Sequence, residues 1–444
     1  ALRSFFGRLT YDYDNRYLVE ANIRRDGTSR IFKDSRWGVF PSFSGAWRII
    51  NEPFMEGTRN VLSDLKLRGG WGVLGNQAIS YYSYQSVLDQ ANYSFGGTVV
   101  QGVAPVDGAN RDLIWETTET LNFGLDMGFL GNQYTLSIEG YRKLTYDILM
   151  KLPVSTLYGL NAPYQNAGKV KNTGLEITAG YKLNTHGWNF QVSANAAYNK
   201  NEVMDLKNGG ARIWSGKYFN QEGYAINSIG GYIAEGLFKT EEEVANSATI
   251  PGTDTAPGDI KYRDINNDGK IDGEDRVYIG NTMPKWTFGL NLFAEWKGLD
   301  ATFLFQGAAD VQGYLAGPGV VGEMIGAKGK PSYMYRDCWD AETNPNGKFP
   351  RAFSSYRQNN SIYNPSSFWI VNSSYLRLKN FQLGYTLPKE WCNMMGISRI
   401  RVYYSGQNLL TFTKFDKGFD PESPEGGSSY PQVKTNTFGL NITF

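Results

Sequence analysis

The chain has 444 residues, of which 15% are aromatic and 20% are charged, and the charges nearly cancel to a formal +1. A near-neutral balance disfavours nucleic-acid binding, which needs a basic patch or stripe. No run of about 18 uninterrupted apolar residues occurs. This excludes a membrane-spanning helix but not membrane-spanning strands, which need only about ten residues of alternating apolarity.

Catalytic side chains are scarce. His186 is the single histidine and falls in a polar turn, so any Ser-His-Asp or Cys-His catalysis would depend on it alone. The two cysteines, Cys338 and Cys392, have no metal-type spacing. We therefore expect no enzyme activity, no catalytic residues and no cofactor-binding residues. The chain begins at Ala1 without a leader peptide, so we expect an internal start or a processed fragment.

Alternation of apolar and polar residues with a period of two dominates the chain. With the turn residues between the alternating segments, this pattern predicts thirteen long strands. Tight turns are expected at Asp14-Asn15, Gly131-Asn132, 184–187 and Gly298. In chain order the expected strands are 3–14, 16–25, 38–50, 64–74, 117–130, 133–144, 169–183, 188–200, 286–297, 299–307, 375–387, 398–408 and 434–444.

The connections between these strands alternate between short turns and long polar loops. The long ones are 26–37, 75–116, 145–168, 201–285, 308–374 and 409–433. Transmembrane barrels have short turns on the periplasmic side and long loops outside, and strands of ten or more residues exceed the usual globular length of about 5–6. The pattern therefore favours an all-β fold, a transmembrane antiparallel β-barrel, with the long loops outside the cell.

The last expected strand shows which side chains would face lipid. Phe438, Leu440, Ile442 and Phe444 fall on one side of it, and the residues between them are Gly, Asn and Thr. The first set suits lipid and the second a wet lumen. An ordinary half-buried edge strand would alternate in the same way, but it would not explain a dozen similar strands before it.

Thirteen is an odd number, whereas an up-and-down barrel needs an even number of strands to close. If Phe444 lies on the periplasmic side, alternation places Arg3 on the outer side. We therefore expect further strands, and whatever fills the lumen, upstream of Ala1.

Several short sequence motifs, taken together and in this order, resemble one family, the SusC/RagA-type TonB-dependent outer-membrane transporters of Bacteroidetes. Each motif alone is weak evidence for the family, but together they span nearly the whole chain. The motifs lie at 24–30, 37–42, 47–48, 65–68, 75–77, 115–118, 172–176, 231–232, 235–238, 375–380, 406–409 and 420–422.

This resemblance implies a barrel of about 22 strands with a plugged lumen. The thirteen strands would be its tenth to twenty-second, and the plug domain and the TonB-contacting segment would be absent from this chain. The resemblance also implies a multi-pass outer-membrane protein that imports oligosaccharides or peptides. Its partners would be a SusD-like surface lipoprotein, the TonB complex acting through the missing plug region, and outer-membrane lipid.

One compact acidic motif lies within the expected outer loop 201–285. It follows the pattern of a calcium loop, with oxygen ligands at positions one, three and five, a glycine at six, a backbone carbonyl at seven, and acidic residues at nine and twelve. We therefore expect a structural Ca²⁺ ion that stiffens the loop. The expected ligands are Asp264, Asn266, Asp268, Lys270, Asp272 and Asp275.

The alternative for this motif is a turn rich in Asp and Asn whose side chains cap their own backbone. No helical pattern flanks it, so it is not expected to act as a calcium sensor. A separate acidic run, 241–243, is interpreted as a solvated face and not as the pair of catalytic carboxylates of a glycosidase.

Aromatic residues in the expected outer loops could stack on sugar rings. For any one of them, a role in packing or in an interfacial girdle is the favoured alternative. The candidate substrate-contacting residues are Tyr82, Tyr84, Trp214, Tyr218 and Trp369. Cys338 and Cys392 are expected on opposite sides of the membrane, so they should not form a disulfide.

Two classes of function remain open from the sequence. The first is a nutrient-import barrel, in which 1–444 is the C-terminal part of the barrel and 201–285, with its acidic loop 264–275, and 308–374 are large extracellular loops. The second is a surface-exposed, calcium-stabilised β-protein such as an adhesin or a glycan-binding module. A barrel would need detergent to be extracted, whereas a module of the second class would be soluble without it.

Overall fold

The computed structural model describes residues 1–315, 336–352, 364–394, 396–415, 419–423, 425, 430 and 432–444. These residues are mainly β-structure, and none of their helices is long and apolar enough to cross a membrane. The chain divides into two units. The first is Ala1–Ile213 with Asn220–Ile226, and the second is Trp214–Phe219 with Asn227–Phe444.

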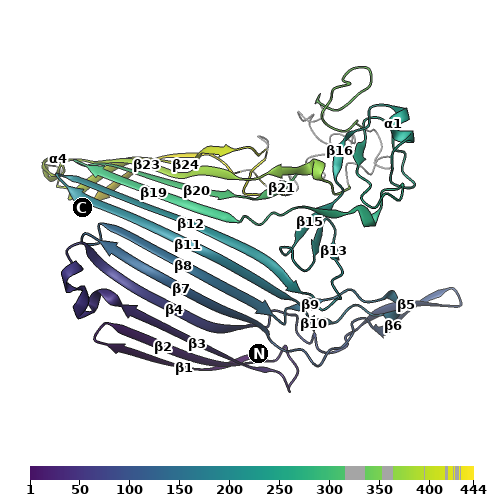
Figure 1. Ribbon diagram of the computed structural model, residues 1–444, viewed down its shortest axis with the longest axis horizontal. Helices are drawn as coiled ribbons and strands as arrows, with labels where there is room; N and C mark the ends of the chain where they lie inside the picture. The colour runs from purple at the N-terminus through teal and green to yellow at the C-terminus, as the bar shows by residue number, and fades with distance from the viewer. Residues whose placement is uncertain are drawn as a thin grey trace. The chain divides into compact units, whose positions relative to one another are not determined.

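The first unit is built on eight long strands, each antiparallel to its neighbours in the order of the chain (Figure 1). Long strands form here because β-branched and aromatic residues alternate with small polar ones, a pattern that suits a pleated surface with two different environments. The strands are β1 (Leu2–Tyr13), β2 (Tyr17–Thr28), β3 (Trp37–Arg48), β4 (Leu62–Asn76), β7 (Glu116–Phe129), β8 (Tyr134–Tyr146), β11 (Lys169–Thr185) and β12 (Trp188–Asp205).

The second unit has five long antiparallel strands, again in chain order. Its pairing shifts by one residue between Leu378 and Asn380, where a β-bulge interrupts the ladder. The strands are β19 (Trp286–Trp296), β20 (Leu299–Ala309), β23 (Tyr375–Thr386), β24 (Arg399–Thr413) and β25 (Thr435–Thr443).

Short turns lie at one end of the strands in each unit, together with the two longer connections 49–61 and 387–398, and the remaining connections lie at the other end (Figure 1). The short ones use the left-handed backbone that tight hairpins require: φ is 52° at Asp14 and 50° at Asn15, 49° at His186, and 47° at Lys297. Such turns match the right-handed twist of the strands. The predicted division into short-turn and long-loop ends is thus present within each unit.

Shorter elements occupy the connections. In the first unit they are η1 (Ile49–Asn51), η2 (Pro53–Thr58), β5 (Leu88–Phe95), β6 (Thr98–Pro105), β9 (Leu149–Lys151), η3 (Thr156–Tyr158) and β10 (Tyr164–Asn166). In the remaining part they are β13 (Ile213–Ser215), β14 (Tyr218–Asn220), β15 (Ser228–Gly231), β16 (Ala234–Leu237), α1 (Glu241–Ala245), β17 (Ile260–Tyr262), η4 (Gly273–Asp275), β18 (Val277–Gly280), β21 (Gln312–Tyr314), η6 (Ser367–Trp369), β22 (Ile370–Asn372) and α4 (Lys389–Met394).

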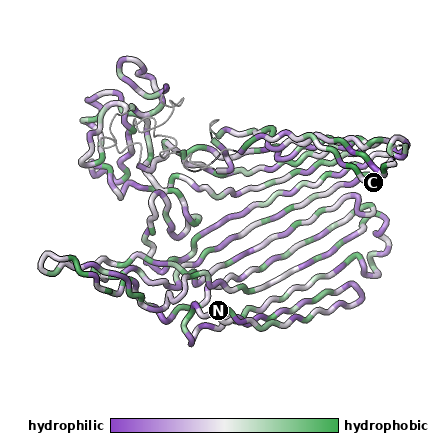
Figure 2. Tube along the Cα trace, turned by 180° about the vertical axis from the view of Figure 1, so that it is seen from behind, coloured by the Kyte–Doolittle hydropathy of each residue, from purple (hydrophilic) through white to green (hydrophobic). Residues whose placement is uncertain are grey.

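Strand register gives the sheet of the first unit two chemically different faces. Large apolar side chains opposite one another across neighbouring strands form what we call the apolar face, whereas the alternate positions form the polar face. The alternation of hydropathy along each strand is visible in Figure 2. Apolar-face residues include Tyr11, Val19, Phe43, Trp71 and Leu121, which follow one another across β1 to β7, and they are exposed.

The second unit repeats this division. Tyr404 lies opposite Phe438 and Val402 opposite Leu440, so the last strand presents its apolar residues on one side, as predicted. Phe438 and Leu440 are exposed. A row of exposed aromatic and aliphatic side chains on a long strand is the arrangement that a lipid-facing surface needs.

All thirteen predicted strands are present, each within five residues of its predicted ends, and the all-β prediction is confirmed. The count of 22 strands and the absence of a plug stay predictions. The β5–β6 hairpin, the β13–β18 region and α4 were not predicted. The predicted loop 308–374 lies partly outside the described residues. Cys338 and Cys392 are both buried, and the structure has no disulfide between them.

The two faces predict different changes in stability for the same substitution at neighbouring positions of β3. Phe43→Arg places a charge on the apolar face, where Phe43 is 58% exposed. Because a lipid-facing arginine near the bilayer midplane costs about 2–4 kcal/mol, the folded barrel should lose that much stability.

Ser44→Arg is the matched control, since Ser44 lies on the polar face opposite Gly70 and Glu20. It should leave stability nearly unchanged. Denaturant unfolding in lipid vesicles measures both variants. Equal losses would contradict the assignment of the two faces.

Candidate functional site

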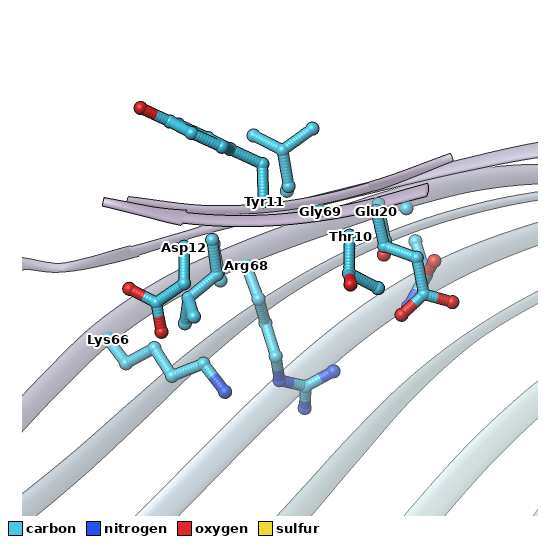
Figure 3. Close-up of a pocket in the computed structure, with 14 residues that line it drawn as sticks. Thr10, Tyr11, Asp12, Glu20, Lys66, Arg68 and Gly69 are labelled. Carbon is cyan, nitrogen blue, oxygen red and sulfur yellow. The ribbon is translucent and has the colours of Figure 1, made fainter. Parts of the chain in front are cut away.

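The polar face of the first unit carries a cavity of about 610 Å³. Thr10, Asp12, Glu20, Lys66 and Arg68 project into it from β1, β2 and β4 (Figure 3). Tyr11, between Thr10 and Asp12, points to the opposite side of the sheet (Figure 3). The cavity is therefore a hollow in the polar wall, lined by side chains of both charges.

Arg68 is the centre of an ion-pair network on this wall. Its Nε donates to Asp126 Oδ2 at 3.0 Å, and its guanidinium also pairs with Glu139. The Ser137 hydroxyl donates to Asp126 Oδ1 at 2.7 Å, and the Asn122 amide donates to Glu139 at 2.8 Å. Both carboxylates thus have further donors, which fixes their orientation on the wall.

A glycine on the neighbouring strand makes room for the Arg68 side chain. A Cβ atom built on Gly124 would lie 2.5 Å from the guanidinium carbon of Arg68. On the second unit, a Cβ on Gly439 would lie 2.1 Å from the ring of Tyr403 in the same way. Large polar side chains therefore lie flat on the wall over glycines, and this gives one physical reason for the abundance of glycine in the sequence.

Charges on this wall are largely compensated within it. Arg8 pairs with Glu20 at 2.7 Å, in addition to the Arg68 network. A surface of this kind offers many hydrogen-bond donors and acceptors with little net charge. It suits polar solutes that are neutral or zwitterionic better than strongly charged ones.

The long connections of the second unit pack around their own apolar core. This core draws on β15, β17, β21 and η6 together with the residues after β24, so segments far apart in the sequence support one another. Its buried members are Ile229, Tyr232, Ile260, Tyr262, Ile271, Tyr314, Leu315, Cys338, Trp369 and Phe415. Burial raises the pKa of the Cys338 thiol to about 11, so this cysteine is a protonated core residue at neutral pH.

A buried arginine ties the connection after β24 to β23. Arg377, 3% exposed, donates to Asp420 and to Glu422 at 2.9 Å each and to the hydroxyl of Thr411 at 3.0 Å. Lys379 adds a pair with Glu422 at 2.8 Å. Burial opposes ionisation of Asp420, but hydrogen bonds, first that from Arg377, outweigh it and hold the pKa of this carboxyl below its ordinary value.

The predicted substrate-contacting aromatic residues have different environments. Tyr82 is exposed, whereas Tyr84 is buried against Phe32, with the ring centres 5.7 Å apart. Trp369 is buried in the core of the second unit. A sugar-binding role for Tyr84 and Trp369 would need these rings to leave their cores, which favours the packing alternative for them.

The other two aromatic candidates lie under cations. The Arg276 guanidinium lies 3.9 Å from the ring centre of Trp214. The Lys217 ammonium lies 5.0 Å from the ring centre of Tyr218 and 4.8 Å from that of Tyr314. Cation–π contacts of this kind occupy one face of each ring. The substrate-binding role of all five candidate residues stays a prediction.

The acidic loop folds around its first residue. Asp264 Oδ1 accepts from the Asn267 amide at 2.7 Å, and its Oδ2 accepts from the Gly269 amide at 2.9 Å. The backbone N–H of Asp268 donates to Asn266 Oδ1 at 3.1 Å. The loop therefore has a tightly wound backbone whose amides are satisfied by its own side chains, an arrangement common to a calcium loop and to the Asp- and Asn-rich turn given as the alternative.

Lys270 and Asp275 complete the loop. The Lys270 ammonium lies 2.6 Å from Asp272 and 3.3 Å from Asp268, and the hydrogen bond to Asp272 raises the pKa of Lys270. Asp275, which is fully buried, accepts from the amides of Ile265 and Asp272 at 2.8 Å each. Within the residues that the structure describes, no three acidic, His or Cys side chains converge as a metal site. The Lys270 ammonium thus lies between the carboxylates of Asp268 and Asp272 and pairs with both.

Sequence reasoning missed the Arg377–Asp420 pair and the Arg68 network. Partners in the first are 43 residues apart, and in the second up to 71 residues apart. The pairing of β4, β7 and β8 brings the Arg68 network together, and the packing of the connection after β24 on β23 brings Asp420 to Arg377. The sequence did single out both segments of the first pair, because 375–380 and 420–422 are among the short motifs that resemble the family. Nothing in these motifs indicates that they contact each other.

Comparison with known proteins places the chain among outer-membrane receptors. Residues 2–409 match the family model described as TonB dependent receptor-like, beta-barrel. TonB-dependent receptor P3 of Formosa agariphila is 31% identical over 100% of this chain and 45% of its own length, and TonB-dependent receptor SusC of Bacteroides thetaiotaomicron is 32% identical over 100% and 44%.

Among solved structures, that of the RagAB peptide transporter matches with a TM-score of 0.79 at 28% identity, and the match covers 100% of this chain and 48% of the other. The chain therefore spans about half the length of the relatives it matches.

The Arg377 network predicts a measurable acid sensitivity of the second unit's long connections. Because the pKa of Asp420 is lowered on folding, its contribution to stability is complete well above the ordinary carboxyl value of 3.8 and is lost as pH falls through the lower folded value. The protection of 419–423 from hydrogen exchange, relative to the intrinsic exchange rate at each pH, should be high at pH 5 and fall below about pH 4.

Asp420→Ala should remove this transition and destabilise the region by about 3 kcal/mol at neutral pH, since it leaves Arg377 buried without its main partner. Asp310→Asn is the control, because the Lys285–Asp310 pair is about half exposed on both sides and should matter little. An Asp420→Ala variant with unchanged exchange would contradict the role of the network.

Proposed function

Because this chain belongs to the family of TonB-dependent receptor β-barrels, whose SusC and RagAB relatives are outer-membrane proteins, we propose that it forms part of the wall of an importer for oligosaccharides or peptides. The family match over residues 2–409 carries the proposal. The long strands, with one apolar and one polar face, support it. The chain itself is an outer-membrane protein and its relatives are transporters, not enzymes.

The complete barrel is proposed to have about 22 strands and a plug in its lumen. In support, β1 pairs only with β2, and β25 pairs only with β24, among the described residues. A strand edge in hydrocarbon leaves backbone N–H and C=O groups without partners, at several kcal/mol for each group. Further strands covering these two edges would remove this penalty, and a closed barrel is the arrangement that does so.

Opening of the plug is proposed to depend on TonB, and the outer mouth is proposed to be covered by a SusD-like lipoprotein. The β5–β6 hairpin is the best supported contact for this lipoprotein. Tyr93, Phe95 and Val100 lie on one side of it and are exposed, and Asp89 is its only charged residue. Isolated two-stranded hairpins are marginally stable in water, and exposed apolar patches mark interaction sites.

The substrate class is supported by the polar face of the first unit. Its paired charges around Arg68 and Glu20 suit solutes rich in hydroxyl or amide groups. Oligosaccharides and peptides both fit this description. The competing function, a soluble adhesin or glycan-binding module, would not explain an apolar face of exposed residues along entire strands.

Uptake by cells that carry the intact protein tests the proposed function. Labelled oligosaccharides and labelled peptides should be offered separately, with and without a protonophore. We expect uptake of one class, and its loss when the proton-motive force is collapsed. Uptake that persists at the full rate without the proton-motive force, or uptake of neither class, would contradict a TonB-dependent importer of these solutes.

The hairpin provides a matched pair of variants for the same cells. Tyr93→Ser with Phe95→Ser should weaken co-purification of the lipoprotein about tenfold or more, because buried aromatic residues dominate such interfaces. Gln90→Ser with Asn92→Ser changes the other side of the same strand and should bind normally.

We further propose that Ca²⁺ binds the acidic loop and displaces the Lys270 ammonium from Asp268 and Asp272. The ligands would be Asp264, Asn266, Asp268, the Lys270 carbonyl, Asp272 and Asp275. Support comes from the spacing of the oxygen donors and from the tight backbone around Asp264. The ion would stiffen the connection between β12 and β19.

Chelation tests this proposal. Removal of Ca²⁺ should speed protease cleavage within 201–285 in the parent protein but not in an Asp268→Asn variant, which lacks one anionic ligand and keeps the same size. Calcium release without any change in the rate of cleavage would contradict a structural role for the ion.

A further inference from the structure

The connection between β3 and β4, residues 49–61, differs from the other hairpin turns of the first unit. It lies at the end of the strands that has short turns, which is the periplasmic end of a transporter of this family. The connections there between β1 and β2, β7 and β8, and β11 and β12 have four residues or fewer, whereas this one holds η1 and η2. We call it the rim segment.

Glu52 fixes the rim segment to the aromatic residues at the ends of β2 and β3. Its Oε1 accepts from the Tyr17 hydroxyl at 2.6 Å and from the Trp47 indole N–H at 2.9 Å, and its Oε2 accepts from Arg16 at 3.3 Å. The side chain of Glu52 is almost fully buried by these partners. The rim segment is therefore held in one position by a carboxylate with three donors.

The aromatic residues that hold Glu52 belong to the apolar face. Tyr17 and Trp47 lie opposite each other in the register, with ring centres 6.3 Å apart, and Tyr13 continues the row at 6.4 Å from Tyr17. Tyrosine and tryptophan collect at the boundary between hydrocarbon and water, where their polar tips usually bond to headgroups or water. Here a protein carboxylate takes the place of those partners, so the rim segment occupies the level of the lipid headgroups.

Beyond Glu52, the rim segment exposes apolar side chains. Phe54 is 67% exposed, and Val61 at its end is also exposed. Among the described residues, the Phe54 side chain is mostly uncovered, and Pro53, next to it, stiffens the backbone at the start of η2. An exposed phenylalanine two residues from a group that binds the interfacial aromatic row is placed to enter lipid.

We propose that the rim segment is a membrane-interface anchor, in which Glu52 fixes the segment to Tyr17 and Trp47 and Phe54 inserts into the phospholipid layer on the periplasmic side. The occupant is phospholipid because the segment continues the lipid-facing row of Tyr13, Tyr17 and Trp47. A periplasmic protein is the other conceivable occupant of an exposed phenylalanine, and the experiment below separates the two.

Depth-dependent quenching tests the proposal. A Phe54→Cys variant of the intact protein, labelled with a polarity-sensitive fluorophore, is reconstituted into vesicles of phosphatidylethanolamine and phosphatidylglycerol. Nitroxide groups are placed on the headgroup, high on the acyl chain, or deep in it. We expect blue-shifted emission and at least twofold stronger quenching by the headgroup and shallow nitroxides than by the deep one. The parent protein, whose Cys338 and Cys392 are buried, is the labelling blank.

A Leu157→Cys variant is the matched control, because Leu157 is exposed in the connection between β9 and β10 at the opposite end of the strands. Its probe should have water-like emission and little quenching. Water-like emission at position 54 in vesicles, or a blue shift that appears only when periplasmic extract is added, would overturn the proposal.

Glu52→Ala in the Phe54→Cys background tests the role of the carboxylate. It should at least halve the shallow quenching, while the heat-dependent gel migration of a folded barrel is kept. Unchanged quenching in a folded Glu52→Ala variant would overturn the part of the proposal that assigns the fixing role to Glu52. Neither outcome depends on the identity of the imported solute.

Discussion

The pairing of backbone groups within the sheet is the constraint on which the rest of this structure depends. In hydrocarbon there is no water to bond an unpaired N–H or C=O, so every residue of a crossing strand must pair with a neighbour. Strands such as β11, with 17 residues, and β12, with 18, pair with each other along nearly their whole length. Long, continuous ladders with tight turns at one end follow directly from this requirement.

Once the ladders are fixed, the pleat determines what each side chain meets. On the apolar face the exposed side chains need no partners, because lipid is their solvent. On the polar face, charged groups lie close to a low-dielectric wall and are paired, as Arg68 is with Asp126 and Arg401 is with Asp300. Glycines opposite Arg68 and Tyr403 let these long side chains lie along the wall. Each sheet is thus one layer thick, with lipid as the solvent of its apolar face and water as the solvent of its polar face.

Alternation and turn residues were enough to predict the strands, since period two and left-handed turns such as Asp14-Asn15 are local signals. The β5–β6 hairpin was missed because its strands mix Gln, Asn and Gly with apolar residues and pack on no core. The Arg377–Asp420 pair could not be predicted, because its partners meet only after β23, β24 and the following connection are in register.

For the candidate site the sequence gives residue types but not their partners. The acidic loop had the spacing of a calcium loop, yet spacing does not say whether Asp268 and Asp272 face an ion or the Lys270 ammonium. The aromatic candidates show the same limit: Tyr82 and Tyr84 are two residues apart, but one is exposed and the other is packed on Phe32. Burial is set by tertiary packing, which composition does not contain.

Within the part of the chain that the structure describes, β1 and β25 each have one unpaired edge, and this has a practical consequence for handling the protein. A long strand edge with unpaired donors and acceptors is a template for pairing with any other strand. Produced without strands that cover these two edges, this stretch of polypeptide would pair with itself in sheets and accumulate as insoluble aggregate, and detergent would not rescue it, since detergent covers apolar side chains but supplies no backbone partners.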